Sequence, residues 1–110
     1  MKPIDRLWRN FIVYEIIIPT HVRKLILRHG KYIKDRFGFQ ETADDVVNRI
    51  FEVIYSLDDN PQRGSHRCVG KYAGTEFRQV FAGNYIIVYK VDEVKRRVHI
   101  DTVRHMLENF

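Results

Sequence analysis

The pattern of apolar and polar residues at the start of the chain predicts a strand followed by a helix. Residues 11–18, FIVYEIII, are rich in β-branched side chains and stop at Pro19, as a strand would. Apolar residues then recur at three- and four-residue steps from Val22 to Phe37. This spacing predicts an amphipathic helix, which Gly38 ends.

A second helix is expected directly after the first. The segment Thr42–Asp45 resembles a capping box and predicts that this helix opens there and runs along apolar positions to Leu57. Residues 58–61, DDNP, would close it. Because the link between the two helices is very short, we expect an antiparallel helical hairpin.

A polar loop over residues 61–75 precedes three strand candidates, at residues 76–82, 85–91 and 97–103. The remaining residues, 104–110, are expected to form a short helix or a loose tail. The predicted order is therefore β-α-α-β-β-β. It indicates an α+β fold, in which an antiparallel sheet packs against the N-terminal helical hairpin.

The pair Gly83-Asn84 is typical of a two-residue hairpin loop between the first two of these strands. Such a loop sets the register, with directly opposed residues on one face: Ala82 with Tyr85, Val80 with Ile87, and Arg78 with Tyr89. The other face would hold Phe77, Gln79, Phe81, Ile86, Val88 and Lys90. Since both faces of residues 85–91 are mostly apolar, we expect a central strand covered at least partly on each side.

Length and composition favour one domain over residues 1–110, with residues 1–10 as an N-terminal extension. The chain has 110 residues, of which 45% are hydrophobic, enough for one core and too few for two. No run is apolar enough to span a membrane, and no signal peptide is recognisable, so we expect a cytoplasmic protein without a membrane partner. Cys68 is the single cysteine, which excludes an internal disulfide.

Charge is unevenly distributed along the chain, whose net charge is +5. Residues 21–36 carry six Lys or Arg against one Asp, whereas residues 40–60 carry six acids against one Arg. The first helix thus presents a basic face, which is either solvated or a contact for nucleic acid or an acidic protein. That face comprises Arg23, Lys24, Arg28, Lys31 and Lys34.

Several polar residues are candidates for a functional site. Arg78 lies among aromatic residues and is either an anchor against Tyr89 or a contact for an anionic partner. His105 and Arg104 follow the last predicted strand and, with Arg78, are the catalytic candidates; a strand-end histidine on the surface is the alternative reading. The polar loop holds a possible phosphate-binding cluster that could equally be an ordinary solvated loop. Its members are Arg63, His66, Arg67 and Lys71.

Metal binding is not expected. His21 and His29 lie eight residues apart on the first predicted helix, and no acidic or cysteine partner completes a metal site with them. We predict neither a metal nor another cofactor.

The combination of motifs in the second half of the chain resembles the RelE/ParE family of bacterial toxins, over roughly residues 11–106. The resemblance rests on Pro61-x-x-Gly64, on Phe77-Arg78-Gln79, on GNYIIVY at residues 83–89, and on VHIDTV followed by Arg104-His105. It implies the toxin half of a type II toxin-antitoxin pair. It also implies a cognate antitoxin that wraps the toxin with an extended segment or a helix.

The resemblance implies different activities for the two branches of the family. RelE-like members cut messenger RNA on the ribosome with basic residues of the sheet face, whereas ParE-like members inhibit DNA gyrase. The usual RelE basic positions fall here on uncharged residues: Phe77, Gln79, Ile86 and Met106. Metal-free phosphodiester cleavage needs a base, an acid and positive charge around one phosphate, so the sequence favours the ParE-like branch.

Three function classes stay open at this stage. The first is a toxin that binds gyrase without being an enzyme. The second is a ribosome-dependent endoribonuclease. The third is a non-toxic nucleic-acid-binding module, although neither an aromatic RNA-binding signature nor a helix-turn-helix pattern is evident.

Overall fold

The computed structural model describes residues 13–37 and 40–110. Strand β1 (Glu15–Ile17) leads into helices α2 (Thr20–Phe37) and α3 (Gln40–Ser56). A single 3-10 turn, η1 (Pro61–Arg63), is followed by strands β2 (Ser65–His66), β3 (Arg78–Ala82), β4 (Tyr85–Asp92) and β5 (Arg97–His105). The predicted succession of elements is confirmed, and the short β2 within the polar loop is an addition that the pattern did not reveal.

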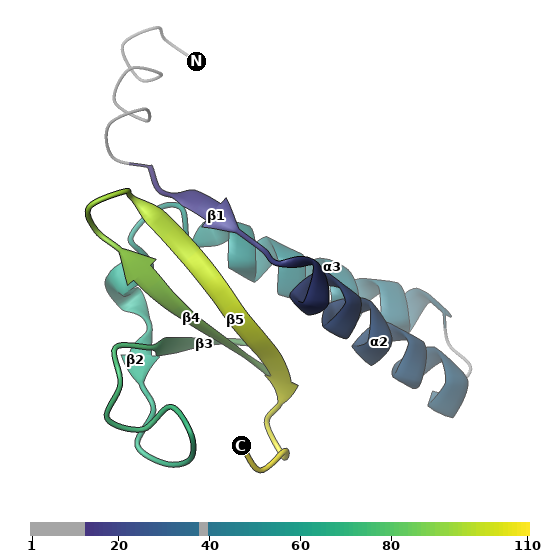
Figure 1. The fold of residues 1–110 in the computed structure, drawn as a ribbon. Coiled ribbons are helices and arrows are strands. Elements are labelled where there is room, and N and C mark those ends of the chain that lie inside the picture. The colour runs from purple at the N-terminus through teal and green to yellow at the C-terminus, as the bar shows by residue number, and fades with distance from the viewer. Residues whose placement is uncertain (1–12, 38–39) are drawn as a thin grey trace, which may run out of the picture.

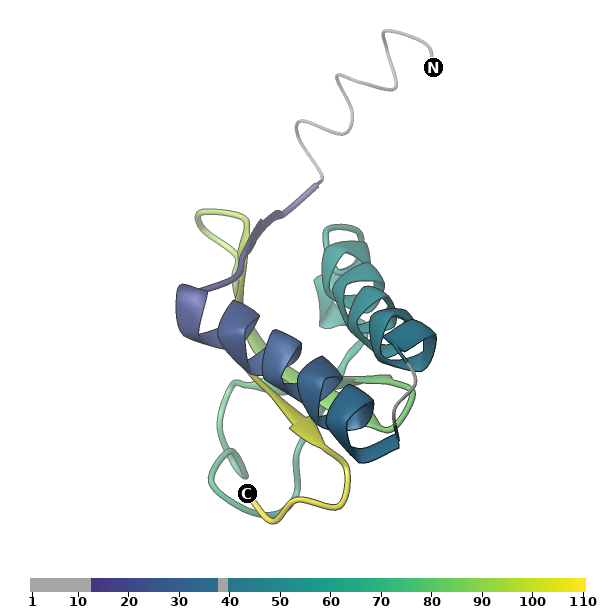
Figure 2. The ribbon, with the colours of Figure 1, turned by 90° about the vertical axis from the view of Figure 1, so that its right-hand side faces the viewer.

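The strands form one five-stranded sheet in the order β1-β5-β4-β3-β2, and the two helices lie side by side on one of its faces (Figures 1 and 2). The predicted α+β class is therefore confirmed. Strands β2 to β5 are antiparallel, as expected, but β1 runs parallel to β5, so the sheet as a whole is mixed. Strand β1 joins the sheet beside the β4–β5 turn, where the Glu15 amide donates to the Arg96 carbonyl at 2.9 Å.

The β3–β4 hairpin has the register that the Gly83-Asn84 pair predicts. Ala82 opposes Tyr85, Val80 opposes Ile87, and Arg78 opposes Tyr89. Gly83 has a φ of 60°, in the left-handed region that such a turn requires and that glycine adopts without strain. The loop sequence therefore sets which side chains share a face of the sheet.

Some element boundaries differ from the predicted ones. Helix α3 already includes Gln40, so the predicted capping position at Thr42 is wrong and Thr42 lies inside the helix. Glutamine and glutamate are good helix formers, which allows the helix to begin earlier. Strand β5 continues to His105, two residues beyond the predicted end, because β4 pairs with it along that length. Two predicted boundaries lie outside the described residues: Phe11, where the first strand was expected to start, and Gly38, where the first helix was expected to end.

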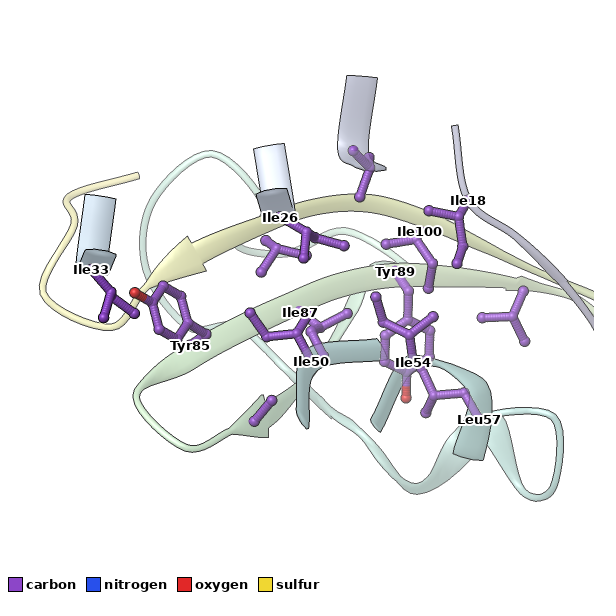
Figure 3. Packing of buried hydrophobic residues seen from close by; sticks show 14 of the residues in the cluster. Ile18, Ile26, Ile33, Ile50, Ile54, Leu57, Tyr85, Ile87, Tyr89 and Ile100 are labelled. Carbon is purple, nitrogen blue, oxygen red and sulfur yellow. The ribbon is translucent and has the colours of Figure 1, made fainter. Parts of the chain in front are cut away.

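The main core lies between the helix pair and the sheet (Figure 3). We call the sheet face under the helices the helix face. The fully buried side chains of this core include Ile26 from α2, Ile50 and Ile54 from α3, and Ile87 and Tyr89 from β4. The helices approach closely at Gly30, where an added Cβ would lie 2.5 Å from Cγ2 of Val47. Neither helix carries the long apolar stretch that crossing a bilayer requires.

Candidate functional site

The opposite face of the sheet, which we call the open face, carries a small aromatic cluster. Tyr72, Ile86 and Val88 are buried there, and Phe77 and Phe110 pack partly buried against them. The ring of Tyr72 meets those of Phe77 and Phe110 edge-on, with centroids 5.1 and 6.4 Å apart. Two of the positions at which RelE-like relatives are expected to hold cations, Phe77 and Ile86, thus belong to an apolar cluster here.

Gln79, the third of those positions, takes part in a hydrogen-bonded arrangement with Arg67. Nη1 of Arg67 donates to Oε1 of Gln79 at 3.0 Å, and the guanidinium carbon lies 3.9 Å from the ring centroid of Phe110. Nε of Arg67 is buried and has no hydrogen-bond partner among the described residues. Arg67 is therefore held against the open face by stacking and by one side-chain amide.

The four polar-loop candidates do not form a single cluster. Arg63 turns toward the end of α3, where it donates to the Ser56 carbonyl at 3.1 Å and to the Ser56 hydroxyl. Nδ1 of His66 lies 3.0 Å from the carbonyl oxygen of Phe77. Lys71 stays at the open face with Arg67, its Nζ 5.3 Å from the ring centroid of Tyr72. Of these four residues, only Arg67 and Lys71 therefore present charge near the aromatic cluster, and a target-binding role for the four residues stays a prediction.

Arg78 lies on the helix face and is bound to the backbone. Its Nη1 donates to the carbonyl oxygens of Gln62 at 3.1 Å and Gly64 at 2.8 Å. The neighbouring hydroxyl of Tyr89 donates to the Pro61 carbonyl at 2.6 Å and accepts from the Gly64 amide at 3.1 Å. These contacts favour the anchor reading of Arg78, because both side chains tie the Pro61–Gly64 segment to the sheet.

Arg104 and His105 are directed to opposite faces of the sheet. Arg104 opposes Ile86 of the open face, whereas His105 opposes Tyr85 of the helix face. Arg104 donates to the Thr102 hydroxyl at 3.0 Å and pairs with Glu108 at 3.3 Å. Arg104 and His105 are separated because consecutive residues of a strand alternate between faces. Arg78 shares the helix face with His105 but opposes Tyr89, four residues along β4 from Tyr85, so the three catalytic candidates do not converge.

A pocket lined by one lysine and two histidines, which we call the β4–β5 pocket, also contains many carboxylates. The cavity measures about 490 Å³ and includes Lys90, His21 and His99. Its other lining residues include four acids: Glu76, Asp92, Glu93 and Asp101. Lys90 lies 3.9 Å from Glu76, and both side chains are well exposed. Such a balance of charge is unsuited to holding a phosphate.

Asp101 also accepts a hydrogen bond from the hydroxyl of Tyr72. Burial and, after it, the hydrogen bond to Asp101 together raise the pKa of Tyr72 to about 12. The phenol therefore keeps its proton at neutral pH and is a donor in the open-face network.

A second pocket, which we call the α2–β5 pocket, gathers residues that the sequence did not bring together. It measures about 520 Å³ and lies between α2 and the end of β5. Its lining residues are Arg28, His29, Tyr32, Tyr85, His105, Leu107 and Glu108. The ring centroid of Tyr85 lies 4.8 Å from that of His29 and 5.2 Å from that of His105. His29 lies three residues after Ile26 and four before Ile33, both of which are buried. This helical spacing is the feature of the sequence that could have indicated that the ring of His29 faces the sheet.

The described residues contain no group of three or more His, Cys, Asp or Glu side chains arranged to hold a metal ion. His21 and His29 line different pockets.

Comparisons with known proteins identify the family of the chain through a family profile and its fold through solved structures. A family profile described as the ParE toxin of the type II toxin-antitoxin system parDE matches residues 12–110. No curated protein matches the chain by sequence. A solved structure of the chromosomal ParDE toxin-antitoxin system from P. aeruginosa superposes with a TM-score of 0.68 at 13% identity, covering 84% of this chain and 96% of that one.

A second solved structure, the toxin-antitoxin complex RelBE2 from Mycobacterium tuberculosis, superposes with a TM-score of 0.58 at 20% identity. The match covers 86% of this chain and 99% of the matched chain. At these identities the two structures show the fold alone. The family to which the chain belongs is shown by the match to the family profile.

Proposed function

Because this chain belongs to the ParE toxin family of type II toxin-antitoxin systems, we propose that it arrests growth by binding and inhibiting DNA gyrase. We propose further that a cognate antitoxin neutralises it by covering part of its surface. The protein acts in this proposal as a binding inhibitor and needs no cofactor.

The observation that carries the proposal is the chemistry of the open face. Phe77 and Ile86 belong to an apolar cluster, and the amide of Gln79 is bonded to Arg67. The nearby cations stack on rings or pair with carboxylates, as Arg67 does with Phe110 and Arg104 with Glu108. Among the described residues, Phe77, Gln79 and Ile86 therefore supply none of the base, acid and free positive charge that metal-free RNA cleavage needs around one phosphate.

The observation that favours the second candidate function, RNA cleavage, lies on the other side of β5. The α2–β5 pocket brings Arg28, His29 and His105 together. Imidazoles are the side chains best suited to proton transfer near neutral pH, and a guanidinium can stabilise a phosphate. An endoribonuclease would in that case use this pocket instead of the open face.

A paired assay separates the two candidates. Purified protein is added to a gyrase supercoiling reaction, and messenger RNA ends are mapped in parallel on translating ribosomes. We expect supercoiling to fall with increasing protein and the messenger RNA to stay intact. Codon-phased cuts with unaffected supercoiling would contradict gyrase inhibition and support the endoribonuclease.

A matched pair of charge reversals tests whether the open face contacts the target. Lys71 lies beside the aromatic cluster, whereas Lys95 is exposed in the turn between β4 and β5. We expect Lys71→Glu to weaken gyrase inhibition about fivefold and Lys95→Glu to leave it nearly unchanged, because a charge acts mainly on the surface it borders. Equal effects of the two reversals would argue against a target contact at the open face.

A further inference from the structure

The α2–β5 pocket combines aromatic walls, two imidazoles and an adjoining basic helix face. We propose that it binds one base of a single-stranded nucleic acid, while neighbouring phosphates lie along α2. The inference concerns binding alone and does not depend on whether gyrase or messenger RNA is the toxin's target.

The walls of the pocket offer aromatic surface to a base. Tyr32 lies at the rim of the pocket and is 61% exposed. Tyr85, 7% exposed, forms the inner wall between the rings of His29 and His105. Stacking on such side chains is the general way in which proteins hold unpaired bases.

Backbone hydrogen bonds set which imidazole nitrogens remain for a ligand. Nε2 of His29 lies 2.8 Å from the Val103 carbonyl oxygen, which can only accept, so that nitrogen donates, and in the neutral imidazole Nδ1 is left as an acceptor. Nδ1 of His105 accepts from the Leu107 amide at 3.1 Å, so Nε2 of His105 is left as a donor. One acceptor and one donor in the same pocket suit the mixed hydrogen-bonding edge of a base.

The carboxylate of the pocket, Glu108, already has a hydrogen-bond donor and a cation as partners. Glu108 accepts from the His105 amide at 3.2 Å and pairs with Arg104 at 3.3 Å. It therefore repels an approaching phosphate less than a free carboxylate would.

A row of cations continues from the pocket along the exposed side of α2. Lys24 and Lys31 lie four residues before and three residues after Arg28, so all three share one side of the helix. Lys31 pairs with Asp35 at 2.8 Å, but both side chains are largely exposed, and such a pair exchanges readily for another anion. A basic track that ends at an aromatic pocket fits a phosphate backbone with one base turned inward better than it fits an apolar peptide.

The test measures fluorescence anisotropy of labelled single strands roughly ten nucleotides long, with the full chain, in DNA and RNA forms and with abasic versions of both. We expect the intact strands to bind about tenfold more tightly than the abasic strands, and Tyr32→Ala to remove that difference. Whichever of DNA or RNA binds more tightly identifies the sugar that the site prefers. Because Tyr32 is exposed, its removal should leave the circular dichroism spectrum unchanged.

Two arginines on α2 provide a matched control. Arg28 lines the pocket, whereas Arg23 lies about 140° away around the helix. Arg28→Gln should weaken binding about fivefold, and Arg23→Gln should weaken it less than twofold. Equal affinity for intact and abasic strands, equal effects of the two arginine changes, or no effect of Tyr32→Ala would each overturn the proposal. Absence of binding to any strand would overturn it as well.

Discussion

The two faces of the sheet use polar groups in different ways. On the helix face, Arg78 and Tyr89 bind backbone groups of the Pro61–Gly64 segment. On the open face, polar side chains mostly bind one another, as Tyr72 does with Asp101 and Arg104 with Glu108. A side chain that satisfies a buried backbone group is difficult to replace, whereas side-chain pairs near solvent can be exchanged.

This difference suggests a division between stability and function. The helix face holds the two helices to the sheet through a continuous hydrophobic core, and hydrogen bonds from Arg78 and Tyr89 hold η1 there. The open face buries a much smaller cluster and leaves its cations at the surface. Outside the α2–β5 pocket, we expect substitutions of buried helix-face residues to act mainly on folding, and those on the open face to act mainly on recognition.

The largest expected effect comes from two adjacent isoleucines of β4 that point to opposite faces. Ile87 is fully buried in the main core, and Ile86 is 6% exposed in the open-face cluster. Truncation to alanine should cost about 4 kcal/mol at Ile87 and about 2 kcal/mol at Ile86, because the smaller cluster can relax around the cavity. Urea denaturation of both variants measures the difference. Equal losses would mean that the two faces contribute alike to stability.

A smaller effect is expected from two tyrosine hydroxyls. Tyr89→Phe should cost about 2 kcal/mol, because it leaves the buried Gly64 amide and Pro61 carbonyl without their partner. Tyr72→Phe should cost less than about 1 kcal/mol, because its partner Asp101 is only partly buried and can be hydrated. Thermal unfolding of both variants provides the comparison. A larger loss for Tyr72→Phe would reverse the proposed ranking of the faces.

The smallest expected effect is a loss of stability in alkali. The pKa of Tyr72 rises from 10.0 in the unfolded chain to about 12 in the folded protein, so the folded state holds the proton more tightly. The resulting stabilisation is complete below pH 10 and is lost as the pH rises toward 12. Burial also raises the pKa values of Tyr85 and Tyr89, which act in the same direction.

The variant Tyr72→Phe shows how much of the stability lost at high pH is due to Tyr72 on the open face. Free energies of unfolding measured at a series of pH values should fall less steeply for the variant than for the native protein above pH 10. Parallel curves for the two proteins would show that the helix-face tyrosines carry the whole effect.

Much of the fold could be predicted, because local patterns carry it. The helical periodicity located α2 and α3, and Gly83-Asn84 determined the β3–β4 register residue by residue. The parallel pairing of β1 with β5 could not be predicted, since nothing in residues 11–18 specifies which distant strand they join. Strand β2 was missed for a different reason: Ser65–His66 is too short and polar to show a pattern.

The candidate site was less predictable than the fold. Grouping Arg63, His66, Arg67 and Lys71 by proximity in sequence failed to anticipate that Arg63 turns to the end of α3. The alternation of β5 separates Arg104 from His105 although they are neighbours in the chain. Conversely, His29 and His105 are far apart in sequence and line one pocket.

The sequence alone determined which segments become helices and strands, how the hairpin pairs, and that uncharged residues stand at Phe77, Gln79 and Ile86. These properties depend on neighbouring residues, whose spacing is readable in the chain. The tertiary structure alone decided that Arg78 holds the Pro61–Gly64 segment and that α2 and β5 enclose an aromatic pocket. Such contacts join residues that are distant in the chain, and they exist only once the core has packed the helices onto the sheet.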